Sequence, residues 1–518
     1  MRTFLARYSS EIKGVVSGFD RLRLRGTIRW LSSLDGLGAY LGTMKILLKD
    51  FREWSMARTE QIGAATERLA EEAGRPLVYL PSSNERKETR ALDIAQADGI
   101  TAGLIAVLKC VEPCHTFSVG PNAETKRLEL RAAQRKCSHL YFYELHPEFG
   151  LMHLRLQTWV PFTIHVCLNG RDWLARQLTQ AGIGFDQRDN CFVDLEDLPA
   201  AQQLLWGQLR RKWPVLLDGL VRRLHPAHRT LFGSSPLTYY WSAEETEWAT
   251  DLMFRSPDAL ARIYPGLVRH AMTTFGSRDV LRFLGQVPRV NRRTKREIVS
   301  STVIRPEGMR VKHASNRNSI KMYDKQQSVL RVETTINDPW DLKVYRPKEG
   351  DPAGPKSWQR MRKGVADLHR RAQLSQKSNE RYLTALAAAE TNAPLSTLVQ
   401  PICQPTEFQG RRIRALQPFS PTDQPLLAAV LRGEFAINGF RNRDLRALLI
   451  GTSEAPADDA KRQAAKITRL IRLLRGHGLI QKVPKTHRYM LTDNGRQTLA
   501  ALHIAQQVSP QKLNQLAV

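Results

Sequence analysis

The chain has 518 residues, 42% hydrophobic and 25% charged, so it is long and apolar enough for several globular domains and is not a disordered basic tail. Its 78 Lys and Arg residues exceed its 50 Asp and Glu residues by 28 charges, which favours a nucleic-acid partner over a small acidic substrate. No apolar run reaches the roughly 20 residues of a membrane span, and the 6 Cys residues form no CxxC pair, so we expect a cytoplasmic protein without a zinc ribbon or disulfide framework.

The positive charge is clustered, which argues against a protein that is merely cationic. Strand and helix patterns interleave along the chain, so we expect a mixed α/β, multidomain fold. The expected divisions are an N-terminal α/β domain with a basic strand (1–125), an α/β sheet domain (126–235), a candidate catalytic or nucleic-acid-binding domain (236–345), a linker with a basic helical arm (346–419) and a winged helix-turn-helix domain (420–518).

The first division contains a strand pattern with one charged face. Arg21, Arg23 and Arg25 alternate with Leu22 and Leu24, which is the period of two expected for a strand. Three guanidinium groups on one face would suit a phosphate backbone. The alternative is an edge strand that its charges protect from aggregation.

The second division carries histidines and aromatic residues in and beside a predicted sheet. His139, His146, His153 and His165 form no HxH metal motif, so structural hydrogen bonding is the simpler interpretation and a catalytic or metal role the alternative. Tyr141 and its aromatic neighbours either stack on bases or fill the core.

The densest basic stretch runs from Arg289 to Lys325. It leads into the segment NRNSIKMYDKQQSVLRVETTIND, whose pattern predicts two strands. We expect this stretch to contact nucleic acid through Arg292, Arg293, Lys295, Arg296, Arg310, Lys312, Arg317 and Lys321.

Carboxylates in the same division suggest a metal site. We expect a helix after Ser242, which would place Glu247 and Asp251 on one face at positions i and i+4. Carboxylates so close repel each other unless a cation lies between them. Together with Glu333, they are the predicted ligands of a Mg²⁺ or Mn²⁺ ion.

The two strands also offer a nucleophile. Tyr323 and Lys325 share one face of their strand, and a tyrosine can form a covalent ester with a phosphate. We expect Tyr323 to attack and Lys325 to contact the scissile phosphate, and across a ladder either residue could face Glu333. The alternative is a strand pair whose Lys and Glu side chains simply satisfy one another.

The segments SIKMYDK and VLRVETTIND resemble a Tyr/Lys strand and an LRxE strand in the replication initiators of rolling-circle plasmids and filamentous phages. This resemblance covers about 20 residues. It implies metal-dependent nicking by a tyrosine. Over most of its length the chain also resembles a widespread group of uncharacterised bacterial proteins, which implies a mobile element but no activity.

Two further basic regions follow. The segment QRMRKGVADLHRRAQLSQ predicts a basic helix whose Arg360, Arg362 and Lys363 would contact nucleic acid. After residue 420, three helical patterns, a strand, a basic tip and a returning strand are typical of a winged helix-turn-helix. Its predicted contacts are Lys461, Arg462, Lys466, Arg469, Arg472, Lys485 and Arg488. A winged helix that contacts protein or RNA is the alternative.

Two functional hypotheses follow. The first is a mobile-element protein that recognises DNA and nicks or joins it, as an endonuclease or strand transferase. The second is a non-enzymatic RNA- or DNA-binding protein, either a regulator or the protein component of a ribonucleoprotein. No Walker A, GxSxG, HExxH or Rossmann motif is present, which removes the basis for nucleotide-driven, esterase, zincin and dehydrogenase activities.

Overall fold

The computed structural model describes residues 1–232, 237–286, 298–305, 308–348, 350–351, 353–387, 395–432, 435, 439–451, 457–484 and 486–509. The fold is mixed α/β, as expected. The chain divides into two compact units. Unit 2 contains residues 14–251 and 333–376, and unit 1 contains residues 1–13, 252–332 and 377–518.

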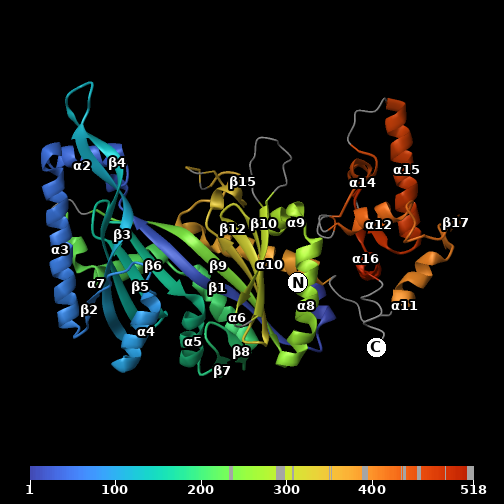
Figure 1. Ribbon diagram of the computed structural model, residues 1–518, viewed down its shortest axis with the longest axis horizontal. Coiled ribbons are helices and arrows are strands. Elements are labelled where there is room, and N and C mark those ends of the chain that lie inside the picture. The colour runs from blue at the N-terminus through green and yellow to red at the C-terminus, as the bar shows by residue number, and fades with distance from the viewer. Residues whose placement is uncertain are drawn as a thin grey trace. The chain divides into compact units, whose positions relative to one another are not determined.

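One large sheet has the strand order β10-β11-β12-β13-β9-β1-β6-β5-β4-β3-β2 (Figure 1). Strands β9 and β13 each contribute residues to both units. The strands that carry the sheet through unit 2 are β1 (Ile12–Thr27), β2 (Leu77–Tyr79), β3 (Gly103–Pro121), β4 (Leu128–His146), β5 (Gly150–Gln157), β6 (Ile164–Asn169), β9 (Tyr240–Phe254) and β13 (Val329–Ile336).

The chain repeats one arrangement, in which a long strand is followed by helices and then by antiparallel strands that return to it. After β1 and its following helices, the antiparallel strands β3 to β6 return so that β6 pairs with β1. After β9 and its following helices, β10 to β13 return so that β13 lies beside β9. The strands that begin the two passages, β1 and β9, are neighbours at the centre of the sheet order.

The helices of unit 2 pack against its strands. Helices α3 and α4 contact β3, and α5 contacts β5. The helices are α2 (Leu34–Thr43), α3 (Phe51–Glu72), α4 (Lys87–Ala97), α5 (Gly170–Ala181), α6 (Leu198–Gly207) and α7 (Trp213–Leu224). Two short hairpins complete the unit, β7 (Phe185–Gln187) with β8 (Phe192–Leu195) and β14 (Lys343–Arg346) with β15 (Ser357–Arg360).

The predicted arginine strand is confirmed as part of β1. Leu22 and Leu24 are buried, whereas Arg21 and Arg25 are exposed and Arg23 is half-buried. However, β1 lies between β9 and β6, so the edge-strand interpretation is wrong.

Unit 1 contains α1 (Arg2–Arg7), α8 (Pro257–Thr274), α9 (Ser277–Phe283), β10 (Ile298–Arg305), β11 (Gly308–Ser315) and β12 (Asn318–Lys325). Its core includes an aromatic cluster of Phe275, Phe283 and Tyr382. Nε2 of His313 on β11 lies within hydrogen-bond distance, 3.1 Å, of the Tyr382 hydroxyl. Tyr382 comes from α10 (Leu368–Leu386), whose first residues belong to unit 2.

Two element predictions are wrong. The helix expected after Ser242 is instead the strand β9, in which Thr246, Trp248 and Thr250 are buried. β-branched and aromatic residues favour strands, and pairing within a large sheet outweighs the helix-like spacing of the carboxylates. The expected basic helix begins only at Leu368, because its first residues end β15 at Arg360 and a short 3-10 helix (Val365–Asp367) follows.

The C-terminal part of unit 1 has its own core, to which Ile467, Ile471 and Leu474 contribute as their helical spacing predicted. Its elements are α11 (Leu395–Val399), β16 (Thr406–Phe408), β17 (Arg411–Ile413), α12 (Gln424–Leu431), α14 (Asn442–Leu449), α15 (Ala457–Gly476), β18 (Ile480–Lys482), β19 (Tyr489–Leu491) and α16 (Asp493–Gln507). Across the described residues, every helix is too short or too polar to cross a bilayer.

Candidate metal centre

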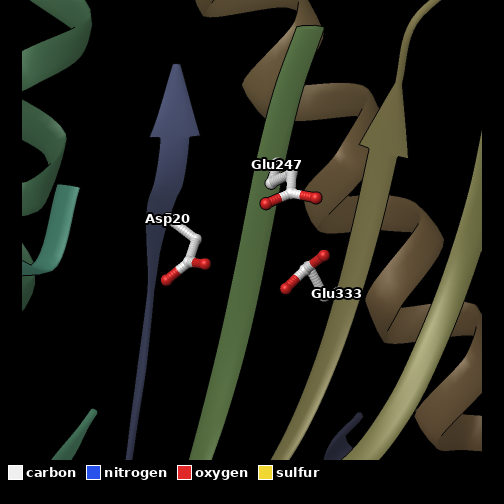
Figure 2. Close-up of side chains that lie close together, drawn as sticks. All are labelled: Asp20, Glu247 and Glu333. Atoms are coloured by element: carbon white, nitrogen blue, oxygen red, sulfur yellow. The ribbon is translucent and has the colours of Figure 1, made fainter. Parts of the chain in front are cut away.

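Three carboxylates converge within unit 2. Asp20 of β1, Glu247 of β9 and Glu333 of β13 each offer one oxygen, and these oxygens all lie within 4.8 Å of one another. Figure 2 shows the three side chains directed toward a common point from three strands. Asp20 is 6% exposed and Glu333 is 1% exposed, so the cluster is largely withdrawn from water.

The sheet order explains this convergence. β13, β9 and β1 are consecutive neighbours, and adjacent strands lie about 5 Å apart, so side chains on a shared face approach one another. Residues that are more than 300 positions apart in the sequence are thereby brought into one site.

Asp20 is held by residues outside the cluster. The side-chain amide of Asn190 donates to its Oδ1 at 2.9 Å, and Nε of Arg171 lies 3.8 Å from the same oxygen. Arg171 reaches this position because α5 begins directly beside β1. A Cβ at Gly170 would lie 1.7 Å from the carbonyl oxygen of Phe19, so only glycine permits this approach.

Asp251 has a different partner. Its carboxylate lies 2.9 Å from Nη2 of Arg171, and both side chains are fully buried. The structure therefore brings together Glu247 and Glu333 of the predicted ligand set, and Asp20 occupies the place expected for Asp251. The sequence did contain a signal for Asp20. Alternate residues of a strand share one face, so Asp20 lies with Leu22 and Leu24 on the buried face of β1.

The side chain of Glu247 is 13% exposed and is the most accessible of the three. Nε of Arg21 lies 4.0 Å from its Oε2. The hydroxyl of Thr335 donates to Oε1 of Glu333 at 3.4 Å. Arg21 and Arg171 therefore flank the cluster on β1 and α5, and each lies near one carboxylate.

The donor set is chemically suited to a hard divalent cation. Mg²⁺ and Mn²⁺ prefer carboxylate, phosphate and water oxygens, and three oxygen ligands leave coordination positions for water or substrate. Three mutually close carboxylates in a largely dry site repel each other, and a divalent cation relieves that repulsion.

The predicted nucleophile lies on β12. Tyr323 and Lys325 belong to unit 1, and both are partly exposed. The hairpin turns through Gln326 and Gln327, whose φ angles are +54° and +62°, and the amide of Ser328 donates to the carbonyl oxygen of Lys325 at 3.3 Å. The predicted strand pair is confirmed, and the catalytic roles of Tyr323 and Lys325 stay predictions.

The predicted nucleic-acid contacts fall into separate groups. Lys312 of β11 lies opposite Lys321 of β12, and neither is fully buried. Arg310 is half-buried and Arg317 is exposed in the turn between these strands. The remaining described groups are exposed Arg360, which ends β15, with exposed Arg362 and Lys363 directly after it, exposed Lys461, Arg462, Lys466 and Arg469 on α15, and half-buried Arg472 and Arg488. Arg292, Arg293, Lys295, Arg296 and Lys485 lie outside the described residues.

One part of the arginine face of β1 is already neutralised. Nε of Arg23 and Nε2 of His165 each lie 3.1 Å from Oε2 of Glu244. The hydrogen bond from His165 and the charge of Arg23 outweigh burial and lower the pKa of Glu244 to about 2. The charge of Arg25 also lowers this pKa, but Arg25 has no ion-pair contact among the described residues.

No protein-family model matches the chain, and neither a curated protein nor a solved structure matches it.

Proposed function

We propose that this protein is a metal-dependent enzyme of a mobile element that nicks or joins DNA. The observation that carries the proposal is the convergence of Asp20, Glu247 and Glu333 from three strands of one sheet. Largely buried carboxylates destabilise the folded protein. In phosphodiester transfer such carboxylates serve to hold the catalytic metal ion.

The carboxylate cluster would hold Mg²⁺ or Mn²⁺. A bound divalent ion supplies charge stabilisation at the non-bridging phosphoryl oxygens and at the leaving oxygen. Asn190 and Arg171 fix the orientation of Asp20, so the ligand geometry is set before the ion arrives. Glu247, the most accessible carboxylate, marks the side from which the ion and substrate would approach.

Tyr323 is the proposed nucleophile, and its resemblance to the tyrosine of rolling-circle initiators supports this role. Its phenolic oxygen would attack phosphorus and form a phosphotyrosine ester. The bond between phosphorus and one sugar oxygen would break, and that oxygen would take up a proton. Lys325, on the same face of β12, would offset the negative charge of the phosphate.

Recognition of duplex DNA is assigned to the C-terminal elements. The order α12, α14, α15, β18, β19 and α16 fits a winged helix, with α15 as the recognition helix. Lys461, Arg462, Lys466 and Arg469 are exposed on α15, where they would meet phosphates or base edges in the major groove.

Incubation of the purified protein with supercoiled and single-stranded DNA from the locus that flanks its gene tests the proposal. We expect nicking that requires Mn²⁺ or Mg²⁺, together with a DNA–protein adduct whose peptide mass maps to Tyr323. A Tyr323→Phe variant should form no adduct. Absence of nicking and of adduct with the wild-type protein would refute the enzymatic proposal.

A second candidate function is nucleic-acid binding without catalysis. It is favoured by the exposed cations on β1, β15 and α15, which are more widely distributed than one nicking site needs. Sequencing of co-purifying nucleic acid separates the two candidates. One abundant structured RNA would support the protein component of a ribonucleoprotein, whereas DNA from a defined locus would support nicking.

A further inference from the structure

A second concave site lies in unit 2. It is a pocket of about 420 Å³, bordered by β1, β3, β4, β5, β6 and β9. None of the three clustered carboxylates lines it in the described part of the chain, so it is distinct from the candidate metal centre. Its volume falls within the range of small-molecule sites. Arg25, Thr116, Phe117, His139, Arg155 and His165 are among its lining residues.

His139 contributes an unsatisfied acceptor to this pocket. Its side chain is fully buried, and Nδ1 lies 3.2 Å from the carbonyl oxygen of Cys137. A carbonyl oxygen can only accept, so Nδ1 carries the proton. Burial, together with the charge of Arg155, lowers the pKa of His139 to about 4, so the ring is neutral at pH 7. Nε2 is therefore a bare acceptor, and it has no hydrogen-bond partner among the described residues.

An unpaired acceptor in a buried site costs roughly 1–3 kcal/mol. A ligand with an N–H or O–H group that reached Nε2 of His139 would remove that cost. Nε2 is itself buried, so a ligand donor reaches it only when the ring or its neighbours shift.

Two of the three arginines in the pocket are already paired. Arg155 donates to Glu112 at 2.7 Å and to the Tyr141 hydroxyl at 2.9 Å, and its Nη1 lies 3.3 Å from Nδ1 of His165. Arg23 lies against Glu244. These contacts fix the walls of the pocket and hold the ring of His165.

Arg25 differs from both. It is exposed, it lies opposite His165 in the pairing of β1 with β6, and its guanidinium has no ion-pair partner in the part of the chain that the structure describes. Phe117, half-buried on β3, supplies an apolar ring to the same pocket. The charge of Arg25 helps to lower the pKa of Glu244, which lines the same pocket. One exposed cation, one aromatic ring and one buried acceptor form a complementary set.

We infer that this pocket binds a nucleoside monophosphate unit. Arg25 contacts the phosphate, Phe117 packs against the base, and an N–H group of the base donates to Nε2 of His139. The unit is either a free nucleotide or an unpaired nucleotide of a strand. The inference rests on the proposed function only in the class of its ligand, a nucleotide, because it requires neither a metal ion nor Tyr323.

The test uses the full-length protein in EDTA, with the four deoxynucleoside 5′-monophosphates, inorganic phosphate and a mixed-sequence single-stranded 12-mer as separate probes. Calorimetry gives the dissociation constants, and ¹⁵N-histidine spectra report on Nε2 of His139. We expect the oligonucleotide, or both the mononucleotides and the oligonucleotide, to move the His139 resonance. Movement by mononucleotides identifies a free-nucleotide site, and movement by the 12-mer alone identifies a strand site.

Arg25→Gln should weaken binding about tenfold, as expected for the loss of one charge-assisted hydrogen bond. Arg127→Gln is the matched control, because Arg127 is exposed and does not line the pocket, and its affinity should stay within about twofold of wild type. His139→Phe should abolish the base contribution, and Arg25→Gln remains informative if that buried substitution prevents folding. Glu333→Gln should retain nucleotide binding even if nicking is lost.

Equal affinity for inorganic phosphate and for every nucleotide would overturn the inference, since only an anion site would remain. An unmoved His139 resonance with all probes would overturn it as well. Neither result depends on whether the protein nicks DNA.

Discussion

The guanidinium of Arg171 lies 2.9 Å from the carboxylate of Asp251, and neither side chain is exposed to solvent. The same guanidinium lies 3.8 Å from Asp20. Arg171 thus ties the start of α5 to two neighbouring strands, β1 and β9. Asp251 serves as its counter-ion, which leaves Asp20 to join Glu247 and Glu333.

Replacement of Asp251 by Asn should destabilise the protein without any metal present. The buried guanidinium would lose its closest counter-ion, which typically costs about 3–5 kcal/mol in the free energy of unfolding. Urea denaturation in EDTA measures the change. Asp186→Asn is the control, because its pairing with Arg188 is largely exposed and should contribute less than about 1 kcal/mol. Unchanged stability of Asp251→Asn would show that Arg171 does not depend on this pair.

Glu333→Gln should separate metal binding from folding. Without metal, its melting temperature should equal or exceed that of the wild type, because one of three clustered carboxylates is neutralised. Mn²⁺ at 100 times its dissociation constant should add about 2.7 kcal/mol to the free energy of unfolding of the wild type. Its melting temperature should rise accordingly. The variant should show little increase. Glu129→Gln, which removes a half-buried carboxylate outside the cluster, should behave like wild type. An equal Mn²⁺ response in Glu333→Gln would place the ion elsewhere.

Acid should weaken unit 2 through Glu112. Burial alone would raise the pKa of this carboxyl, but hydrogen bonds from Arg155 and Tyr141 outweigh it and lower the pKa to about 2. A carboxyl whose folded pKa lies below its unfolded value stabilises the fold above the unfolded pKa, and this contribution disappears as pH falls toward the folded pKa.

The expected loss between about pH 5 and pH 2 is up to roughly 3 kcal/mol. Urea denaturation at several pH values measures it. Glu112→Gln should be less stable than wild type at pH 7 and should show a shallower decline in acid. A variant with the wild-type slope would exclude Glu112 as the titrating group.

Binding of duplex DNA should depend on α15. The double substitution Lys466→Gln, Arg469→Gln removes two exposed cations, so the slope of log affinity against log salt should fall in magnitude by about 2. Fluorescence anisotropy at several salt concentrations measures the slope. Lys49→Gln, Arg52→Gln removes two exposed cations from unit 2 and should leave it unchanged if α15 is the recognition helix.

Local patterns in the sequence predicted local structure well. The alternation around Arg23 and the helical stripe of Ile467 each follow from one segment, and both are found. The strands that carry Tyr323 and Glu333 were recognisable for the same reason.

The metal centre depended on long-range pairing, which no single segment encodes. Glu247 and Asp251 have the spacing of a helical pair, yet they lie on β9 because β1 and β13 flank that strand. Asp20 could be recognised as an inward-facing carboxylate, but its proximity to Glu247 follows only from the order of strands in the sheet. The pocket beside His139 likewise draws on six strands.

The most direct test of the central claim compares DNA cleavage by wild type, Asp20→Asn, Glu247→Gln and Glu333→Gln, titrated with Mn²⁺ and checked for folding by circular dichroism. The account predicts nicking of supercoiled DNA that requires Mn²⁺ in the wild type and is lost in all three folded variants, while Glu129→Gln remains active. Cleavage by the wild type that persists unchanged in the three variants would contradict it.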